Sequence, residues 1–282
     1  MSSEDNIFPK YSLDLSGKFL FIILIWKIIL FFIYNKVPDE SRKYDPQLID
    51  AYLSEDGINQ SKSRQEELNK LDIEKVYVSP YNRALETMTY ALKNHPNIQN
   101  IVAIVHPKIS ELVWTVHDFI LDIKQKKQEF NMNSLVKVYW SYFDEYNKNS
   151  IYDENFFYFE NMNLLDEKIK ESEYLKLKNL YHKGKLKEFK DEIGRFIKEN
   201  KKDYIKYESF KHSYERFEEF KNYIKKEFKE TINNKNKKIL CISHSGFIMT
   251  ASSPSPFLKD ERDEKKDKLY HPGFCEIISL SI

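Results

Sequence analysis

Four polar side chains lie at the ends of predicted strands or in the segments that follow them: Arg83, Glu111, His244 and His106. A guanidinium binds phosphate oxygens in pairs, an imidazole donates a hydrogen bond to them, and a carboxylic acid protonates a leaving oxygen. In open α/β sheets the carboxyl ends of the strands meet at one edge, where ligands bind. These residue types in these places therefore indicate a phosphate-binding pocket.

Each of these residues also has a purely structural interpretation. Arg83 could pair with Glu86, one helical turn further along the chain. A histidine at a strand end is often structural, and Glu111 could be a solvated carboxylate. The pocket is the stronger interpretation because Arg83, Glu111 and His244 recur at the positions where such a pocket would form.

A strand, a helix and a second strand are predicted between residues 75 and 105. Lys75–Pro80 is a short apolar strand that ends at a Ser-Pro turn, Arg83–Leu92 has helical spacing of its apolar residues, and Ile101–Val105 is again strand-like. Upstream, Ser54 is the expected N-cap of a helix that runs to about residue 70. This succession is a βαβ unit, so a parallel sheet is the expected core.

The sheet resumes late in the chain. Residues 238–243 form an apolar strand that leads to His244, and residues 274–282 alternate as a last strand would. Residues 119–207 are dense in Lys, Glu, Phe and Tyr and are predicted to be an α-helical insertion. The helix after them has one apolar stripe, which we expect to face the core: Tyr214, Phe217, Phe220, Ile224 and Phe228.

The N-terminal part of the chain leaves two alternatives open. Residues 1–17 are polar and are predicted to be disordered, and residues 18–36 contain the apolar run Phe19–Ile33. This run is either a short membrane helix, which implies a membrane contact through Phe19–Ile33, or it contains a buried first strand at Lys27–Ile33. Residues 37–282 then form one α/β domain with its helical insertion.

Composition limits the function classes. The 282 residues include 45 Lys and Arg and 44 Asp and Glu. The resulting net charge of +1 gives no reason to expect a nucleic-acid partner. Cys241 and Cys275 lie in strand-like sequence and do not form a disulfide framework, which favours a reducing compartment. The expected location is cytoplasmic, with anchoring through the N-terminal apolar segment as the alternative.

Several segments resemble one known family. Ser79–Thr87 is similar to the Ser-Pro-x-x-Arg-Ala-x-x-Thr segment of the histidine phosphatase superfamily, also called the phosphoglycerate mutase-like family. Leu53–Gln60 resembles its Leu-Thr-x-x-Gly-x-x-Gln segment, Glu111-Leu112 its acid-bearing loop, and His244-Ser245-Gly246 its second-histidine motif. Glu208-Ser209 with Arg216 and Phe220 resembles the helix that precedes that motif. The resemblance covers roughly residues 45–118 and 208–282.

The resemblance implies a three-layer α/β/α sandwich around a mainly parallel sheet, with a helical insertion, and a reaction through a phosphohistidine. By position, Arg83 would bind the phosphoryl oxygens, His244 would donate to the same group, and Glu111 would be the proton donor. The implied partner is a phosphorylated small molecule or a phosphoprotein. No cofactor and no metal are implied.

One motif of the family is missing. Its nucleophilic histidine lies in an Arg-His-Gly motif just after the first strand, yet this chain has no histidine before His95. If Lys27–Ile33 is the first strand, Asn35 occupies the nucleophile's place, and asparagine cannot take up a phosphoryl group in that way. Alternatively, the first strand is absent or replaced, because residues 18–40 are foreign to the domain, as a membrane anchor or a misread gene segment.

Three functions are compatible with the sequence. The first is a phosphohydrolase or phosphomutase of this superfamily. The second is a catalytically inactive pseudophosphatase that binds a phosphorylated ligand through Arg83 and His244. The third is a membrane-tethered interaction protein, in which Phe19–Ile33 is the anchor.

Overall fold

The computed structural model describes the segments that build one sheet and the helices against it. These are residues 21–26, 48–112, 116–118, 120, 123–133, 135–140, 209–231, 237–253, 272–273 and 275–280, together with individual positions between 176 and 195.

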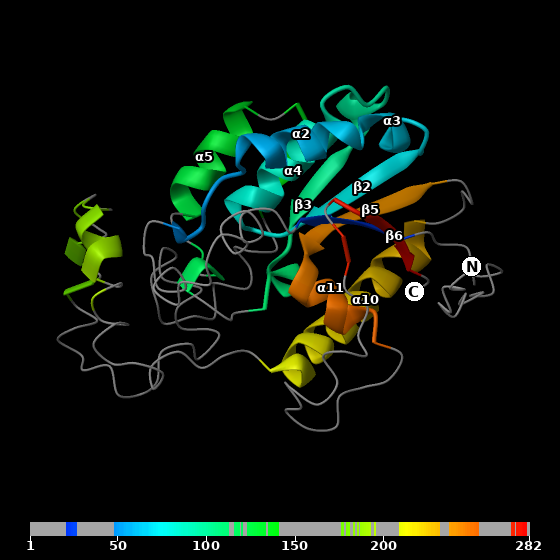
Figure 1. Ribbon diagram of the computed structural model, residues 1–282. Helices are drawn as coiled ribbons and strands as arrows, with labels where there is room; N and C mark the ends of the chain where they lie inside the picture. Colours follow the sequence, from blue (N-terminus) through cyan, green and yellow to red (C-terminus); the bar gives the residue numbers. More distant parts are fainter. Residues whose placement is uncertain are drawn as a thin grey trace, which may run out of the picture.

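A six-stranded sheet is the centre of the described structure (Figure 1). Its strands are β1 Phe21–Trp26, β2 Ile73–Val78, β3 Val102–Val105, β4 Lys137–Tyr139, β5 Lys238–His244 and β6 Ile277–Leu280. The spatial order is β4-β3-β2-β5-β1-β6, with β6 antiparallel to β1 and all other neighbours parallel. The predicted mainly parallel sheet is confirmed.

The two central strands show why both faces of the sheet are covered. In β2, Val76 and Val78 pack in one apolar cluster while Tyr77, between them, packs in another. In β5, Leu240 and Ile242 likewise share a cluster, and Ile239 and Cys241 belong to the opposite one. Successive side chains of a strand point to opposite faces, so an apolar run without polar gaps requires a layer on each side.

Helices supply those two layers, as Figure 1 shows. One face is covered by α2 Glu55–Ser63, α3 Gln65–Leu68, α4 Asn82–Leu92 and α5 Ile123–Asn133, and the other by α10 Phe210–Thr231 and α11 Ser245–Ala251. The predicted stripe of α10 is confirmed for Phe217, Phe220 and Ile224, which are buried against the sheet, with Tyr214 packed beside them. The molecule is the expected three-layer α/β/α sandwich.

The N-terminal apolar run contributes a strand. Phe21–Trp26 lies between β5 and β6, with Trp26 paired to His244 in the β1–β5 register. The membrane-helix interpretation is therefore wrong for these six residues, because neighbouring strands pair with their backbone. Lys27–Ile33, the stretch predicted as the first strand, lies outside the described residues. Across the described part of the chain, no helix has the length and apolar character needed to span a membrane.

The segment predicted as a helical insertion begins with parts of the sandwich itself. Helix α5 packs on the sheet through Ile123 and Phe130, and Lys137–Tyr139 then adds to the edge of the sheet as β4, parallel to β3. A three-residue edge strand leaves little periodic signal in a sequence, which explains why it escaped prediction. Most of residues 141–207 lies outside the described residues.

Candidate functional site

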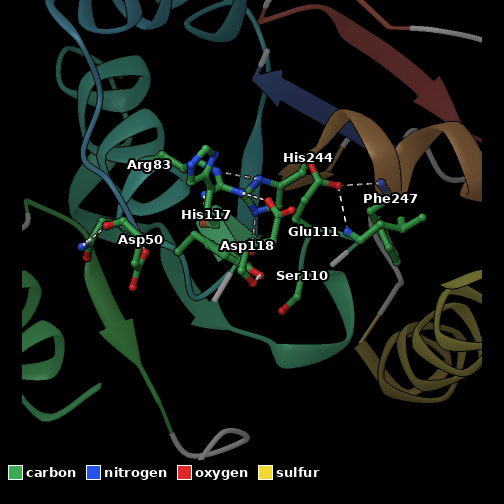
Figure 2. Close-up of polar contacts among 12 residues, drawn as sticks. Asp50, Arg83, Ser110, Glu111, His117, Asp118, His244 and Phe247 are labelled. Atoms are coloured by element: carbon green, nitrogen blue, oxygen red, sulfur yellow. Dashed lines mark hydrogen bonds and ion pairs between the residues drawn. The ribbon is translucent and has the colours of Figure 1, made fainter. Parts of the chain in front are cut away.

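The carboxyl ends of β2 and β5 bring together residues that are far apart in the chain. Ser79 follows β2, and its backbone N–H donates to the carbonyl of Ile242 at 2.9 Å, which places it beside the end of β5. His244 is the last residue of β5. Figure 2 shows Arg83 reaching His244 across 161 residues of sequence. The structure thus brings these two predicted site residues into contact at the carboxyl ends of β2 and β5.

Arg83 lies in the first turn of α4, and three groups hold its guanidinium. Its Nε donates to Nδ1 of His244 at 3.3 Å, Nη1 to the carbonyl oxygen of His117 at 3.4 Å, and Nη2 to Oδ1 of Asp118 at 3.4 Å. The ring of Tyr81 lies against the guanidinium, 4.3 Å from centroid to carbon. Arg83 is only 7% exposed, and these contacts fix the orientation of its guanidinium.

The simple surface pairing of Arg83 with Glu86 does not occur. Oε2 of Glu86 accepts the backbone N–H of Leu53 at 2.6 Å, and among the described residues Glu86 makes no ion pair. The carboxylate thereby joins the start of α2 to α4. Thr87, one turn after Arg83, donates its hydroxyl to the Arg83 carbonyl at 2.8 Å.

His244 is neutral, and its hydrogen bonds define which nitrogen carries the proton. Because Arg83 Nε donates to Nδ1, the proton lies on Nε2, which donates to Oγ of Ser79 at 2.7 Å. The residue is 1% exposed. Burial first, and the neighbouring charges of Arg83 and Arg216 second, hold the pKa of His244 well below its usual range. In this arrangement Arg83 and Ser79 engage both ring nitrogens and fix the orientation of the imidazole at the end of β5.

Glu111 lies beside the start of α11. Its Oε1 accepts the backbone N–H of Leu112 at 2.9 Å and that of Phe247 at 3.1 Å (Figure 2). The pKa of this carboxyl is raised to about 7, by burial first and by the charge of Asp118 second, while Arg83 and the two N–H groups act in the opposite sense. The group can therefore hold or release a proton near neutral pH, as a proton donor requires.

The glycine of the His-Ser-Gly segment leaves room for this carboxylate. A Cβ on Gly246 would lie 2.6 Å from Oε1 of Glu111, closer than any ordinary contact. A side chain there would push Glu111 away from the Phe247 N–H. The spacing between His244 and Gly246 thus couples the histidine at the strand end to the position of the acid.

Arg216 of α10 holds the segment that carries Glu111. Its guanidinium donates to the carbonyls of Lys108 at 2.7 Å and Ser110 at 3.3 Å, and it lies 5.2 Å from the ring centroid of Phe247. Ser243 also donates to the carbonyl of Ile109 at 2.7 Å. Both contacts lie on the face of the sheet that α10 covers, and together they hold the segment that carries the acid.

His106 is not part of this group. Although it follows β3, it packs against the rings of Phe220 and Tyr223, at centroid separations of 4.8 and 5.3 Å, and its Nδ1 accepts the Lys108 N–H at 3.2 Å. Burial lowers its pKa to about 3. The structural interpretation holds for His106, because its side chain points to the face of the sheet that α10 covers.

Sequence reasoning missed Asp118. Its carboxylate pairs with Arg83, and its carbonyl accepts the hydroxyl of Tyr81 at 2.5 Å. It follows Glu111 by seven residues in a segment without clear periodicity, where it forms the end of the short 3₁₀ turn η5 Val116–Asp118. The only hint in the sequence was that Asp118 closely follows Glu111, because a second acidic residue is unexpected near a site predicted to bind phosphate.

A buried ion pair supports the N-terminus of α4. Asp50 accepts the backbone N–H of Asn82 at 3.0 Å through Oδ1, and its other oxygen pairs with Lys126 of α5. Lys126 also donates to the carbonyl of Pro80 at 3.0 Å. Both charged side chains are 2% exposed. Together they hold the loop between Ser79 and Arg83 from outside the site.

No nucleophilic histidine follows β1. The register places Trp26 beside His244, and the residues that follow the strand are Lys27 and Ile28. The interpretation that gave Asn35 the nucleophile's place depended on a first strand at Lys27–Ile33, and Asn35 lies outside the described residues. Among the described residues, no three His, Cys, Asp or Glu side chains gather as a metal site.

The comparisons with known proteins agree with these motifs. The sequence model of the histidine phosphatase superfamily, branch 1, matches residues 41–132. The matched range contains Arg83, Glu111 and Asp118, while β1 precedes it and His244 lies beyond it. None of the curated proteins compared with the chain matches it.

Proposed function

Because residues 41–132 match the sequence model of the histidine phosphatase superfamily, we propose that this chain binds a phosphate group at Arg83 and His244. The phosphate would belong to a small phosphate ester or to a phosphoprotein. The observation that carries the proposal is the contact between Arg83 Nε and His244 Nδ1 at 3.3 Å, at the carboxyl edge of the sheet. A planar, permanently charged donor beside a neutral imidazole suits a tetrahedral anion.

Glu111 extends the proposal from binding to proton transfer. A carboxyl group whose pKa is about 7 is substantially protonated at neutral pH and can donate to an ester oxygen. The charge of Arg83 acts on this carboxyl, so the acid and the guanidinium serve the same site. Glu111 is accordingly proposed as the proton donor.

The family's covalent route has no identified nucleophile. With Trp26 beside His244 and no histidine before His95, a phosphohistidine cannot form after β1. This favours ligand binding without the usual turnover, as in a catalytically inactive pseudophosphatase, over a phosphohydrolase or phosphomutase. Binding and turnover are therefore tested separately.

Binding is tested with inorganic phosphate and with vanadate, by titration calorimetry. Arg83→Ala should lower the affinity for either anion by about tenfold to a hundredfold, because charge-assisted hydrogen bonds contribute roughly 1.5–3 kcal/mol. Arg64→Ala, which removes a guanidinium that pairs with Glu67 outside the site, is the matched control and should bind as the wild type does. Equal affinities of the wild type and Arg83→Ala would overturn the proposed site.

Turnover is tested with an aryl phosphate and by radiolabelling. We expect little hydrolysis and no acid-labile phosphohistidine on the wild-type chain. Robust hydrolysis that disappears in both Arg83→Ala and His244→Ala would contradict the proposal that the chain is inactive. It would still support the proposed phosphate site. It would then identify the chain as an enzyme with a different nucleophile.

A further inference from the structure

The guanidinium of Arg83 already has an anion beside it. Oδ1 of Asp118 lies 3.4 Å from Nη2, and both residues are 7% exposed. The carbonyl of His117, the preceding residue, accepts Nη1 at 3.4 Å. The two outer nitrogens of the fork, which would bind a phosphate in pairs, therefore face a single short segment of the same chain.

That segment is held in place from the other side. The hydroxyl of Tyr81 donates to the carbonyl of Asp118 at 2.5 Å, and the ring of Tyr81 lies against the guanidinium of Arg83. Tyr81 thus contacts both members of the ion pair. Figure 2 shows Asp118 and Glu111 on the same side of Arg83. Through Tyr81, the loop that precedes Arg83 therefore also holds Asp118 in position.

The charges of the site follow from these contacts. His244 is neutral, so the positive charge of Arg83 is balanced by the carboxylate of Asp118. A phosphate dianion that bound to Arg83 would meet Asp118 within a few ångströms, where like charges repel strongly in a water-poor site. Binding therefore requires the Asp118 carboxylate to move away from Arg83.

We propose that Asp118 is a resident anion that competes with the ligand for Arg83 and sets the affinity of the site for phosphate. This inference rests on the proposed phosphate-binding function and makes it more specific. It assigns Asp118 a role in ligand selection: ligands whose own contacts displace the carboxylate bind, while free inorganic phosphate binds weakly.

The test compares variants of the full chain for inorganic phosphate binding by titration calorimetry, at constant pH and ionic strength. Asp118→Asn keeps the shape and removes the charge, and should bind phosphate at least about tenfold more tightly than the wild type. Asp118→Ala should also bind more tightly. Asp118→Glu, which keeps the charge, should not.

Asp72→Asn is the matched control, because it makes the same chemical change just before the opposite end of β2. Asp72 is surface-exposed and pairs with Lys237 at 2.8 Å. This variant should bind phosphate as the wild type does. Circular dichroism and thermal unfolding of each variant establish that it is folded, and Asp118→Ala provides a second measurement if Asp118→Asn is not.

The outcomes separate the inference from the function on which it rests. If Arg83→Ala abolishes binding but neither Asp118→Asn nor Asp118→Ala tightens it, the competing role of Asp118 is overturned and the phosphate site stands. If neither the wild type nor any Asp118 variant binds phosphate, both fail. Binding that is detectable only after the charge of Asp118 is removed supports both.

Discussion

At the scale of single residues, the site depends on groups whose charge state is set by burial. His244 is neutral because a buried imidazolium next to Arg83 would be unfavourable, and Glu111 is partly protonated at neutral pH because its carboxylate would be poorly solvated. These two shifts leave Arg83 and Asp118 as the opposed charges in direct contact. Anion binding should therefore depend on pH through Glu111.

Glu111→Gln should remove a pH dependence of anion binding. Since the pKa of Glu111 is raised to about 7, the carboxyl is neutral below that pH and charged above it, so wild-type affinity should fall as the pH rises from 6 to 8. We expect a decrease of roughly threefold to tenfold, and little decrease in Glu111→Gln. Sulfate, which remains a dianion over this range, is the probe for calorimetry.

The interpretation of this experiment depends on the slope rather than on the absolute affinity. Glu111→Gln keeps an acceptor oxygen for the N–H of Phe247, so the start of α11 should remain in place. An unchanged slope in the variant would show that another group causes the pH dependence.

At the scale of elements, α4 and α5 meet through a buried charge pair that supports the Arg83 loop. Lys126 of α5 pairs with Asp50 and donates to Pro80, while Asp50 accepts the N–H of Asn82 at the start of α4. A pair so fully removed from water contributes little as a pair, but the loss of one partner leaves an uncompensated charge.

Lys126→Met should therefore lower the free energy of unfolding by about 3–5 kcal/mol, measured by urea denaturation. Asp50→Asn combined with Lys126→Met should recover part of that loss, because Asn retains an acceptor for the N–H of Asn82. Lys70→Met removes an exposed partner of Glu66 and should change stability by less than about 1 kcal/mol. Equal losses of unfolding free energy in Lys126→Met and Lys70→Met would contradict this account of the pair.

At the scale of the whole molecule, the sandwich buries titratable groups whose charged forms are disfavoured. His106 packs under α10 with its pKa lowered to about 3, and His244 lies at the edge of the sheet. Cys241 and Cys275 are free and buried, and burial raises the pKa of each thiol, that of Cys275 to about 11. The sandwich therefore favours the neutral forms of several side chains, and acid should destabilise it because His106 and His244 resist protonation.

The buried histidines His106 and His244 make the folded state less stable in acid. Below pH 6.5 the unfolded chain binds protons at His106 and His244 that the folded chain does not, so stability is lost as the pH falls. His106→Asn, which retains a capping acceptor, should reduce this slope by about 1.4 kcal/mol per pH unit below pH 5.5. Phe220→Leu loosens the same aromatic cluster without removing a titratable group, and should lower stability at every pH while keeping the slope. Urea denaturation between pH 4 and 8 measures both.

Much of the site could be predicted because its residues follow strands with strong apolar signals. Lys75–Pro80 and residues 238–243 each contain an unbroken apolar run, so their ends, and with them Arg83 and His244, could be placed at one edge of a parallel sheet. Asp118 could not, because nothing periodic surrounds it. The face to which His106 points could not be assigned either, since a one-residue change of strand end reverses it.

The sequence by itself determined the class of the fold and the placement of Arg83 and His244 at the carboxyl ends of strands, because apolar periodicity and motif spacing are local properties of the chain. Only the tertiary structure decided that Phe21–Trp26 is a strand between β5 and β6, that Lys137–Tyr139 forms one edge of the sheet, and that Asp118 faces Arg83. A strand's partners and the counter-ion of a buried charge depend on segments distant in sequence. They are decided when the sheet assembles and water is excluded.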